Sequence, residues 1–119
     1  MKYMIMMFCG VGEAMADRSP EWVAGLHRTL QDLDAELRES GEVVGGGKLV
    51  DPAAATTVRF AAGAPVTTDG PFAEVKESLA GYWLVEASEA RAVEIASKVV
   101  AYTEFPMEVR RVMDESSVP

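Results

Sequence analysis

The sequence has little of what builds covalent or metal cross-links: one cysteine, Cys9, and one histidine, His27. A single cysteine excludes a disulfide within the chain, and one cysteine with one histidine is too few soft ligands for a structural zinc site. Because Cys9 follows an apolar run, we expect a buried, inert thiol, with a reactive thiol as the alternative. The sequence predicts no metal and no cofactor.

Basic residues are also few. The chain has 11 Lys and Arg against 19 Asp and Glu, which gives a formal net charge of -8. Its one pair of adjacent basic residues is Arg110 and Arg111. An acidic chain repels phosphate backbones, so we expect no nucleic-acid partner.

Long hydrophobic runs are missing as well. The apolar run at residues 3–8 is about half as long as the core of a signal peptide, and no run approaches the roughly 18 residues needed to span a bilayer. We therefore expect no membrane partner and a cytoplasmic location. The 119 residues suit one domain, with the polar residues 114–119 as a frayed tail.

The first half of the chain predicts strand, helix, strand. Residues 2–8 are a short apolar segment ended by glycines. Ser19 and Pro20 are typical of a helix start, and Gly41 of its end. Residues 42–50 form a strand weakened by three consecutive glycines. The leucines of the helix fall on one face with a valine: Val23, Leu26, Leu30, Leu33 and Leu37.

The second half predicts a hairpin, a strand, a helix and a last strand. Residues 56–60 alternate in polarity and turn back at residues 61–64. Residues 81–86 form a strong strand, and Ser88 caps a second helix. Residues 106–113 form a closing strand. The apolar face of the second helix is predicted to comprise Val93, Ala96, Val99 and Val100.

This order indicates an α+β fold of the ferredoxin-like βαββαβ type with an extra hairpin. Residues 2–8 and 81–86 are apolar in both parities and are placed centrally, whereas 56–60 and 107–111 alternate and are placed at the edges. Two helices cover one face of such a sheet. The other face would present Tyr, Trp, Met and Phe side chains, which a second copy of the chain would bury. The prediction is a homodimer.

His27 is the one candidate for histidine chemistry. It lies at the edge of the apolar stripe of the first helix, two turns before Asp34. It is either a general base oriented by that carboxylate or a boundary histidine that contacts solvent or a neighbour.

The segment from Asp69 to Glu77 is the richest in information. We predict a rigid turn at Asp69, Gly70 and Pro71, anchored by the side chain of Phe72 in the core. The charged side chains that follow form either a solvated loop or the mouth of a cleft that binds a polar ligand. Together with His27, the candidate ligand-binding residues are Asp69, Glu74, Lys76 and Glu77.

This segment and the residues after it, Leu79-x-Gly81-Tyr82, resemble the signature of the DGPF branch of the YCII-related family. The strands at 57–59 and 107–110 are also similar to that family. The resemblance implies a dimeric α+β barrel of ferredoxin-like protomers, with Gly70, Pro71, Phe72, Gly81 and Tyr82 as structural residues of the signature.

The family's function is mostly unassigned. Some members resemble small lyases or dehydrochlorinases that act on ring compounds with a His–Asp pair. The histidine of that pair follows a proline at the start of the first helix, but Pro20 is followed by Glu21, Trp22 and Val23. The aspartate is expected after the second helix, where the nearest carboxylate is Glu104. The pair is therefore missing.

DGPF proteins also occur with extracytoplasmic-function sigma factors, so the resemblance implies a regulatory, ligand-sensing role. The leading hypothesis is a homodimeric protein that binds a small molecule and is linked to a sigma factor. The alternative is a small cofactor-independent enzyme, lyase- or hydrolase-like, with acid–base chemistry from Asp69, Glu74 or Glu77. A third hypothesis is a stress or assembly factor without a ligand.

Overall fold

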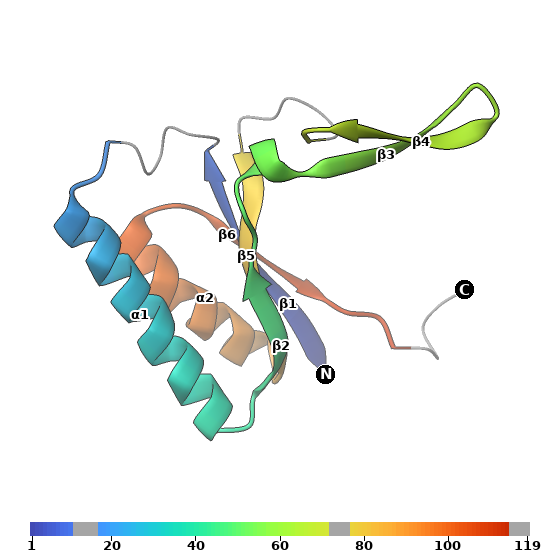
Figure 1. Ribbon diagram of the computed structural model, residues 1–119. Coiled ribbons are helices and arrows are strands. Elements are labelled where there is room, and N and C mark those ends of the chain that lie inside the picture. The colour runs from blue at the N-terminus through green and yellow to red at the C-terminus, as the bar shows by residue number, and fades with distance from the viewer. Residues whose placement is uncertain (11–16, 72–76, 115–119) are drawn as a thin grey trace.

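The computed structural model describes residues 1–10, 17–71 and 77–114, in which two helices lie against one face of a four-stranded sheet (Figure 1). A short 3-10 helix, η1, follows β2. The elements in chain order are β1 (Lys2–Gly10), α1 (Pro20–Glu39), β2 (Val43–Lys48), η1 (Pro52–Ala54), β3 (Thr56–Ala61), β4 (Ala64–Asp69), β5 (Glu77–Glu86), α2 (Glu89–Thr103) and β6 (Met107–Arg111).

The strand order of the sheet is β2-β5-β1-β6, and all its neighbouring pairs are antiparallel. The two central strands, β1 and β5, are those predicted from their apolar residues of both parities. This α+β arrangement is compatible with a ferredoxin-like fold. One predicted edge strand is wrong: β2 is the outer strand beside β5, and β3 pairs with β4 in a separate two-stranded sheet. Because a tight turn follows β3, its backbone hydrogen bonds are made with the neighbouring strand β4. The position of β2 in the main sheet was not predicted, because its three glycines carry no hydrophobic pattern.

The predicted start of α1 is confirmed. Ser19 is the N-cap residue, and its hydroxyl accepts a hydrogen bond from the Trp22 amide at 3.1 Å. Near this end α1 lies very close to α2. A Cβ added to Gly25 would collide with the hydroxyl of Tyr102, so the close approach requires glycine. That hydroxyl donates to the Trp22 carbonyl at 2.7 Å. The start of α1 is thereby fixed against the end of α2.

The core lies between the helices and the sheet. Its largest fully buried apolar side chains come from both helices and the two central strands: Ile5, Leu37, Val85, Ile95 and Val99. The predicted face of α2 is wrong at one position, since Val93 is 49% exposed. Ala92 and Ile95 point inward instead, because the face that contacts the sheet is rotated by about one residue from the predicted one.

The sheet face away from the helices is lined by apolar side chains. Met4 is paired with Leu84, and Met6 with Tyr82, so these side chains share that face. Trp83 was expected there, but it packs against the core on the helix side. The reason is the strand alternation, which points Trp83 and Tyr82 to opposite faces.

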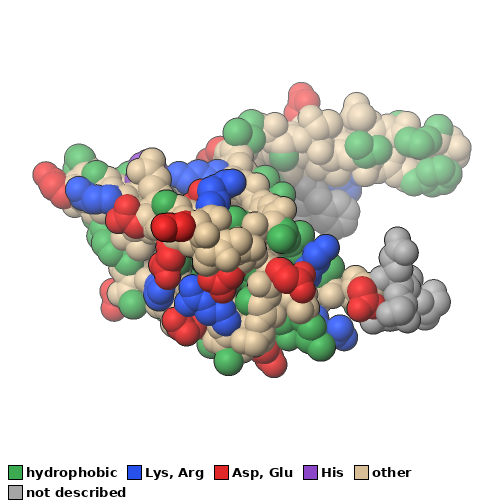
Figure 2. Space-filling view, turned by 90° about the horizontal axis from the view of Figure 1, so that it is seen from below, with side chains coloured by type: hydrophobic (Ala, Val, Ile, Leu, Met, Phe, Trp, Pro, Cys, Tyr) green, Lys and Arg blue, Asp and Glu red, His purple; other side chains and the backbone are tan. Residues whose placement is uncertain are grey.

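Strands β3 and β4 form an arm that projects away from the sheet (Figure 1). Ala62 and Gly63 make the predicted turn, both with positive φ. On the arm Val58 is 65% and Phe60 78% exposed, and Figure 2 shows hydrophobic side chains toward its outer end. The radius of gyration is 16.5 Å, against about 13.5 Å for a compact domain of this length. The arm therefore lies largely outside the chain's own core.

Candidate functional site

A cavity of about 650 Å³ lies between α1 and the β2–β5 side of the sheet. Three glycines of β2, Gly45, Gly46 and Gly47, line the cavity. They contribute backbone atoms to its wall but no side chains. Gly46 has φ of +152°, and a Cβ there would come within 2.6 Å of the Tyr82 carbonyl oxygen. Glycine is therefore required at position 46, where β2 pairs with Trp83 of β5.

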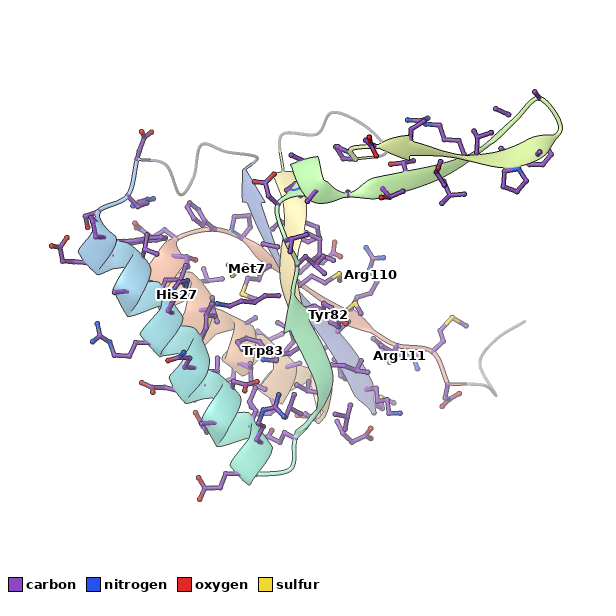
Figure 3. The ribbon with its side chains drawn as sticks, viewed as in Figure 1. Met7, His27, Tyr82, Trp83, Arg110 and Arg111 are labelled. Carbon is purple, nitrogen blue, oxygen red and sulfur yellow. The ribbon has the colours of Figure 1, made fainter. Side chains whose placement is uncertain are left out.

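The inner wall of the cavity is apolar and comes from four elements. Figure 3 shows Met7 and Trp83 between α1 and the sheet, with His27 on the helix beside them. The apolar side chains of the wall include Met7, Leu26, Leu30, Leu79, Trp83 and Met107. Such a wall favours the burial of an apolar ligand surface.

One carboxylate, Asp34, is fixed on this wall by two donors. The Trp83 indole N–H donates to Asp34 Oδ1 at 3.2 Å, and Arg38 Nε donates to Asp34 Oδ2 at 2.8 Å. The hydrogen bond from Arg38 is the main cause that holds the pKa of the Asp34 carboxyl below its ordinary value; burial opposes it, and the hydrogen bond from Trp83 adds to the lowering. Asp34 is therefore ionised at neutral pH, and it locks the Trp83 ring in place.

Other polar side chains stand at the rim. Gln31 and Lys48 line the cavity, and Lys48 has no hydrogen bond or ion pair to its ammonium group among residues 1–10, 17–71 and 77–114. Asp51 also lines it, and its Oδ1 accepts from the Ala53 amide at 2.8 Å, which caps η1. The rim thus holds an uncommitted cation beside carboxylates that already have partners.

The first helix carries most of this polar set at regular spacing. His27, Gln31, Asp34 and Arg38 follow one another at intervals of four, three and four residues, which places them on one side of α1. Sequence reasoning singled out only His27 and Asp34. The same helical spacing pointed to Gln31 and Arg38, whereas nothing in the sequence pointed to the indole of Trp83.

The structure brings His27 and Asp34 to one cavity but does not join them. The oxygens of Asp34 accept hydrogen bonds from Trp83 and Arg38, and His27 is exposed at the rim. The hypothesis of a histidine oriented by Asp34 therefore lacks its hydrogen bond among the described residues.

The other predicted site residues lie apart from this cavity or outside the described residues. Asp69 is exposed at the end of β4 and does not border the cavity. Gly70 closes the base of the arm, since its amide donates to the Ala55 carbonyl at 2.7 Å and its carbonyl accepts from the Thr57 hydroxyl at 2.7 Å. Pro71 is exposed.

Phe72, Glu74 and Lys76 lie outside the described residues, as does the side chain of Glu77, the first residue of β5. The cleft role predicted for this charged segment stays a prediction. Two residues from the C-terminal part of the signature, Gly81 and Tyr82, do border the cavity.

A family model for the YCII-related domain matches residues 1–116. The chain belongs to the YCII-related family. An uncharacterized protein of Rhizobium meliloti (strain 1021) is 41% identical over 64 residues, an alignment that covers 51% of this chain and 52% of that protein. The chain thus spans about half the length of this curated relative.

Two features are absent from the described residues of this YCII-related protein. No helix there is both long and apolar enough to cross a membrane. No group of three or more His, Cys, Asp or Glu side chains there is arranged to hold a metal ion. The predictions about metals and partners remain predictions.

Proposed function

We propose that this YCII-related protein is a cytoplasmic homodimer that binds a small molecule in the cavity between α1 and the sheet. The observation that carries the proposal is the cavity itself. Its volume of about 650 Å³ falls within the range of about 300–1,000 Å³ that is common for ligand sites. It also combines an apolar wall with a few polar groups at fixed positions.

The Asp34 hydrogen bonds support a preformed site. Arg38 and Trp83 hold the carboxylate from two sides, so the indole ring is oriented before any ligand arrives. A wall that is already ordered costs less conformational entropy on binding. The same geometry favours a flat ligand that stacks on Trp83.

The homodimer is supported by apolar surface that the chain leaves without helices over it. Met4, Tyr82 and Leu84 are partly exposed on the open face of the sheet, and Phe60 is exposed on the arm. An isolated two-stranded hairpin is marginally stable in water, so packing against a partner would stabilise the arm. A second copy has the same open face to offer, and a two-fold axis would pair the two surfaces.

Light scattering tests the homodimer and should give twice the chain mass of 12.8 kDa. Phe60→Ser should shift the population toward monomer, because it removes an apolar ring from the arm. Val93→Ser is the matched control, since Val93 is 49% exposed on α2, away from both surfaces. A monomeric wild-type chain would contradict the proposal.

A regulatory role is the extension that the DGPF resemblance supports. In such a role, ligand binding would change the association of this protein with a sigma factor. Co-purification of the two proteins with and without ligand tests it. The enzyme alternative draws less support from the cavity. Of the described carboxylates that border it, Asp34 has both oxygens occupied and Asp51 caps η1.

A thermal-shift screen tests the binding proposal directly. A ligand present at 100 times its Kd adds about 2.7 kcal/mol to the free energy of unfolding. Gln31→Trp places an indole at the cavity and should abolish the shift given by any true ligand. Asp32→Trp is the matched control, because its neighbour Asp32 is exposed and does not line the cavity. Equal shifts in both variants would place the ligand elsewhere.

A further inference from the structure

The two ends of the cavity differ in chemistry. In Figure 1, β2 lies beside α1 and runs in the opposite direction. The end of β2, at Lys48, is therefore level with the first half of α1, where His27 lies, whereas Arg38 is level with the beginning of β2. At the Arg38 end the guanidinium is already paired with Asp34. The Lys48 end remains open for a ligand group.

The polar side chains of the cavity differ in whether they already have hydrogen-bond partners. Each oxygen of Asp34 accepts one hydrogen bond, from Trp83 or from Arg38, and Asp51 Oδ1 accepts one from the Ala53 amide. Lys48 offers three N–H donors and has no partner among the described residues. This cation, unpaired within the described part of the chain, matches an acceptor-rich, anionic group.

The apolar wall specifies the rest of the ligand. Trp83 pairs with Gly46, and Lys48 pairs with Gly81 two residues along β5, so the ammonium and the indole belong to neighbouring parts of one wall. Gly46, opposite Trp83, has no side chain to cover the ring, and both residues line the cavity. A ring system lying on the indole would bring a directly attached anionic group toward Lys48.

From these observations we propose that the cavity takes a small planar carboxylic acid, with its ring against Trp83 and its carboxylate on the ammonium of Lys48. The inference rests on the proposed function and names its ligand class. In a chain with a net charge of -8, a cation at the cavity is what lets an anion approach.

The test compares two probes of nearly the same shape, 2-naphthoate and its neutral amide, 2-naphthamide, by isothermal titration. Wild type should bind the naphthoate about 10-fold or more tightly than the amide, as expected for a charge-assisted hydrogen bond. Lys48→Met should bring the two affinities close to equality by weakening only the naphthoate, and Lys48→Arg should restore most of the preference. Lys2→Met is the matched control, because exposed Lys2 on β1 does not line the cavity.

Equal affinities in wild type would overturn the ligand class, and a preference that survives Lys48→Met would overturn the contact with Lys48; both results leave the binding proposal standing. Failure of both probes to bind at about 1 mM would also overturn the class. The binding proposal itself fails separately, if no compound of a library, of whatever charge, gives a thermal shift that Gln31→Trp removes.

Discussion

The layer between helices and sheet differs between its two halves. On the β1–β6 side, α2 packs closely on the sheet, and Ile95 and Val99 have no exposed surface. On the β2–β5 side, α1 faces a strand with three glycines, and a cavity of about 650 Å³ remains. One half supplies stability through packing, and the other half gives up packing and holds polar groups around a hollow.

The hollow half is held together by directed bonds. Arg38, Asp34 and Trp83 connect α1 to β5, and Arg91 of α2 bonds Glu42 just before β2 at 2.8 Å and 3.0 Å. Such bonds fix positions without filling volume. The difference teaches that a glycine-rich edge strand can leave part of a helix–sheet interface unfilled.

The largest expected effect is in the filled half. Ile95→Ala should lower the free energy of unfolding by about 2–5 kcal/mol, because it removes methylene groups from a fully buried position and leaves a void. Urea unfolding followed by circular dichroism measures it. Val93→Ala on the same helix should cost about 0.5 kcal/mol or less, since Val93 is half exposed. Equal costs would contradict the account of a filled half.

Gly46→Ala should be the next largest, in the hollow half. The new Cβ would come within 2.6 Å of a backbone oxygen at a φ of +152°, so we expect a loss of about 1–3 kcal/mol. Gly47→Ala is the matched control, because a Cβ there meets nothing within 4 Å. If both substitutions unfold at the same urea concentration, the geometry assigned to Gly46 is wrong.

The bonds of Glu42 predict an acid sensitivity. The hydrogen bond from Arg91, and then that from Ser40, hold the pKa of the Glu42 carboxyl below its ordinary value, against a smaller effect of burial. Because the folded pKa is lowered, this stabilisation is present above the unfolded pKa of about 4.3 and is lost as pH falls through the folded pKa. The Tm of wild type should therefore fall between about pH 5 and pH 3.

Glu42→Gln should flatten that acid-induced fall in Tm, and at neutral pH it should lower Tm by about 4 °C or less, as suits a partly exposed ion pair. Glu39→Gln is the control, since Glu39 is exposed at the end of α1. An acid profile unchanged by Glu42→Gln would show that the Arg91 pair has no share in it.

His27→Ala should have the smallest effect on stability. His27 is exposed at the rim, so the loss should be about 1 kcal/mol or less in thermal unfolding. A larger loss would mean that the histidine holds the hollow half together. Loss of ligand binding with the fold intact would instead give His27 a direct role in the site.

Particular elements show how far the sequence could predict the fold. The central strands followed from apolar residues of both parities, the start of α1 from Ser19 and Pro20, and the turn of the arm from Ala62 and Gly63. The place of β2 did not follow, because glycines carry no hydrophobic pattern, and β3 matched an edge strand although it pairs only with β4.

The site was harder to predict for a physical reason. A cavity is an absence of side chains, and its outline depends on how far α1 stands from a glycine strand that no local pattern reports. His27 was predicted as a candidate, and the helical spacing to Gln31 and Arg38 was present in the sequence. The bond between Asp34 and Trp83 joins residues 49 positions apart, so only the folded chain shows it.

The two tryptophans provide the most direct test of the cavity as the ligand site. Trp83 lines the cavity, and Trp22 lies outside it, with ring centroids 5.6 Å from Tyr102 and 6.2 Å from Phe105. The measurement is fluorine NMR of protein labelled with 5-fluorotryptophan, assigned with Trp22→Phe and titrated with a compound that raises Tm. The account predicts that the Trp83 resonance shifts and the Trp22 resonance stays in place. A stationary Trp83 resonance beside a rising Tm would contradict it.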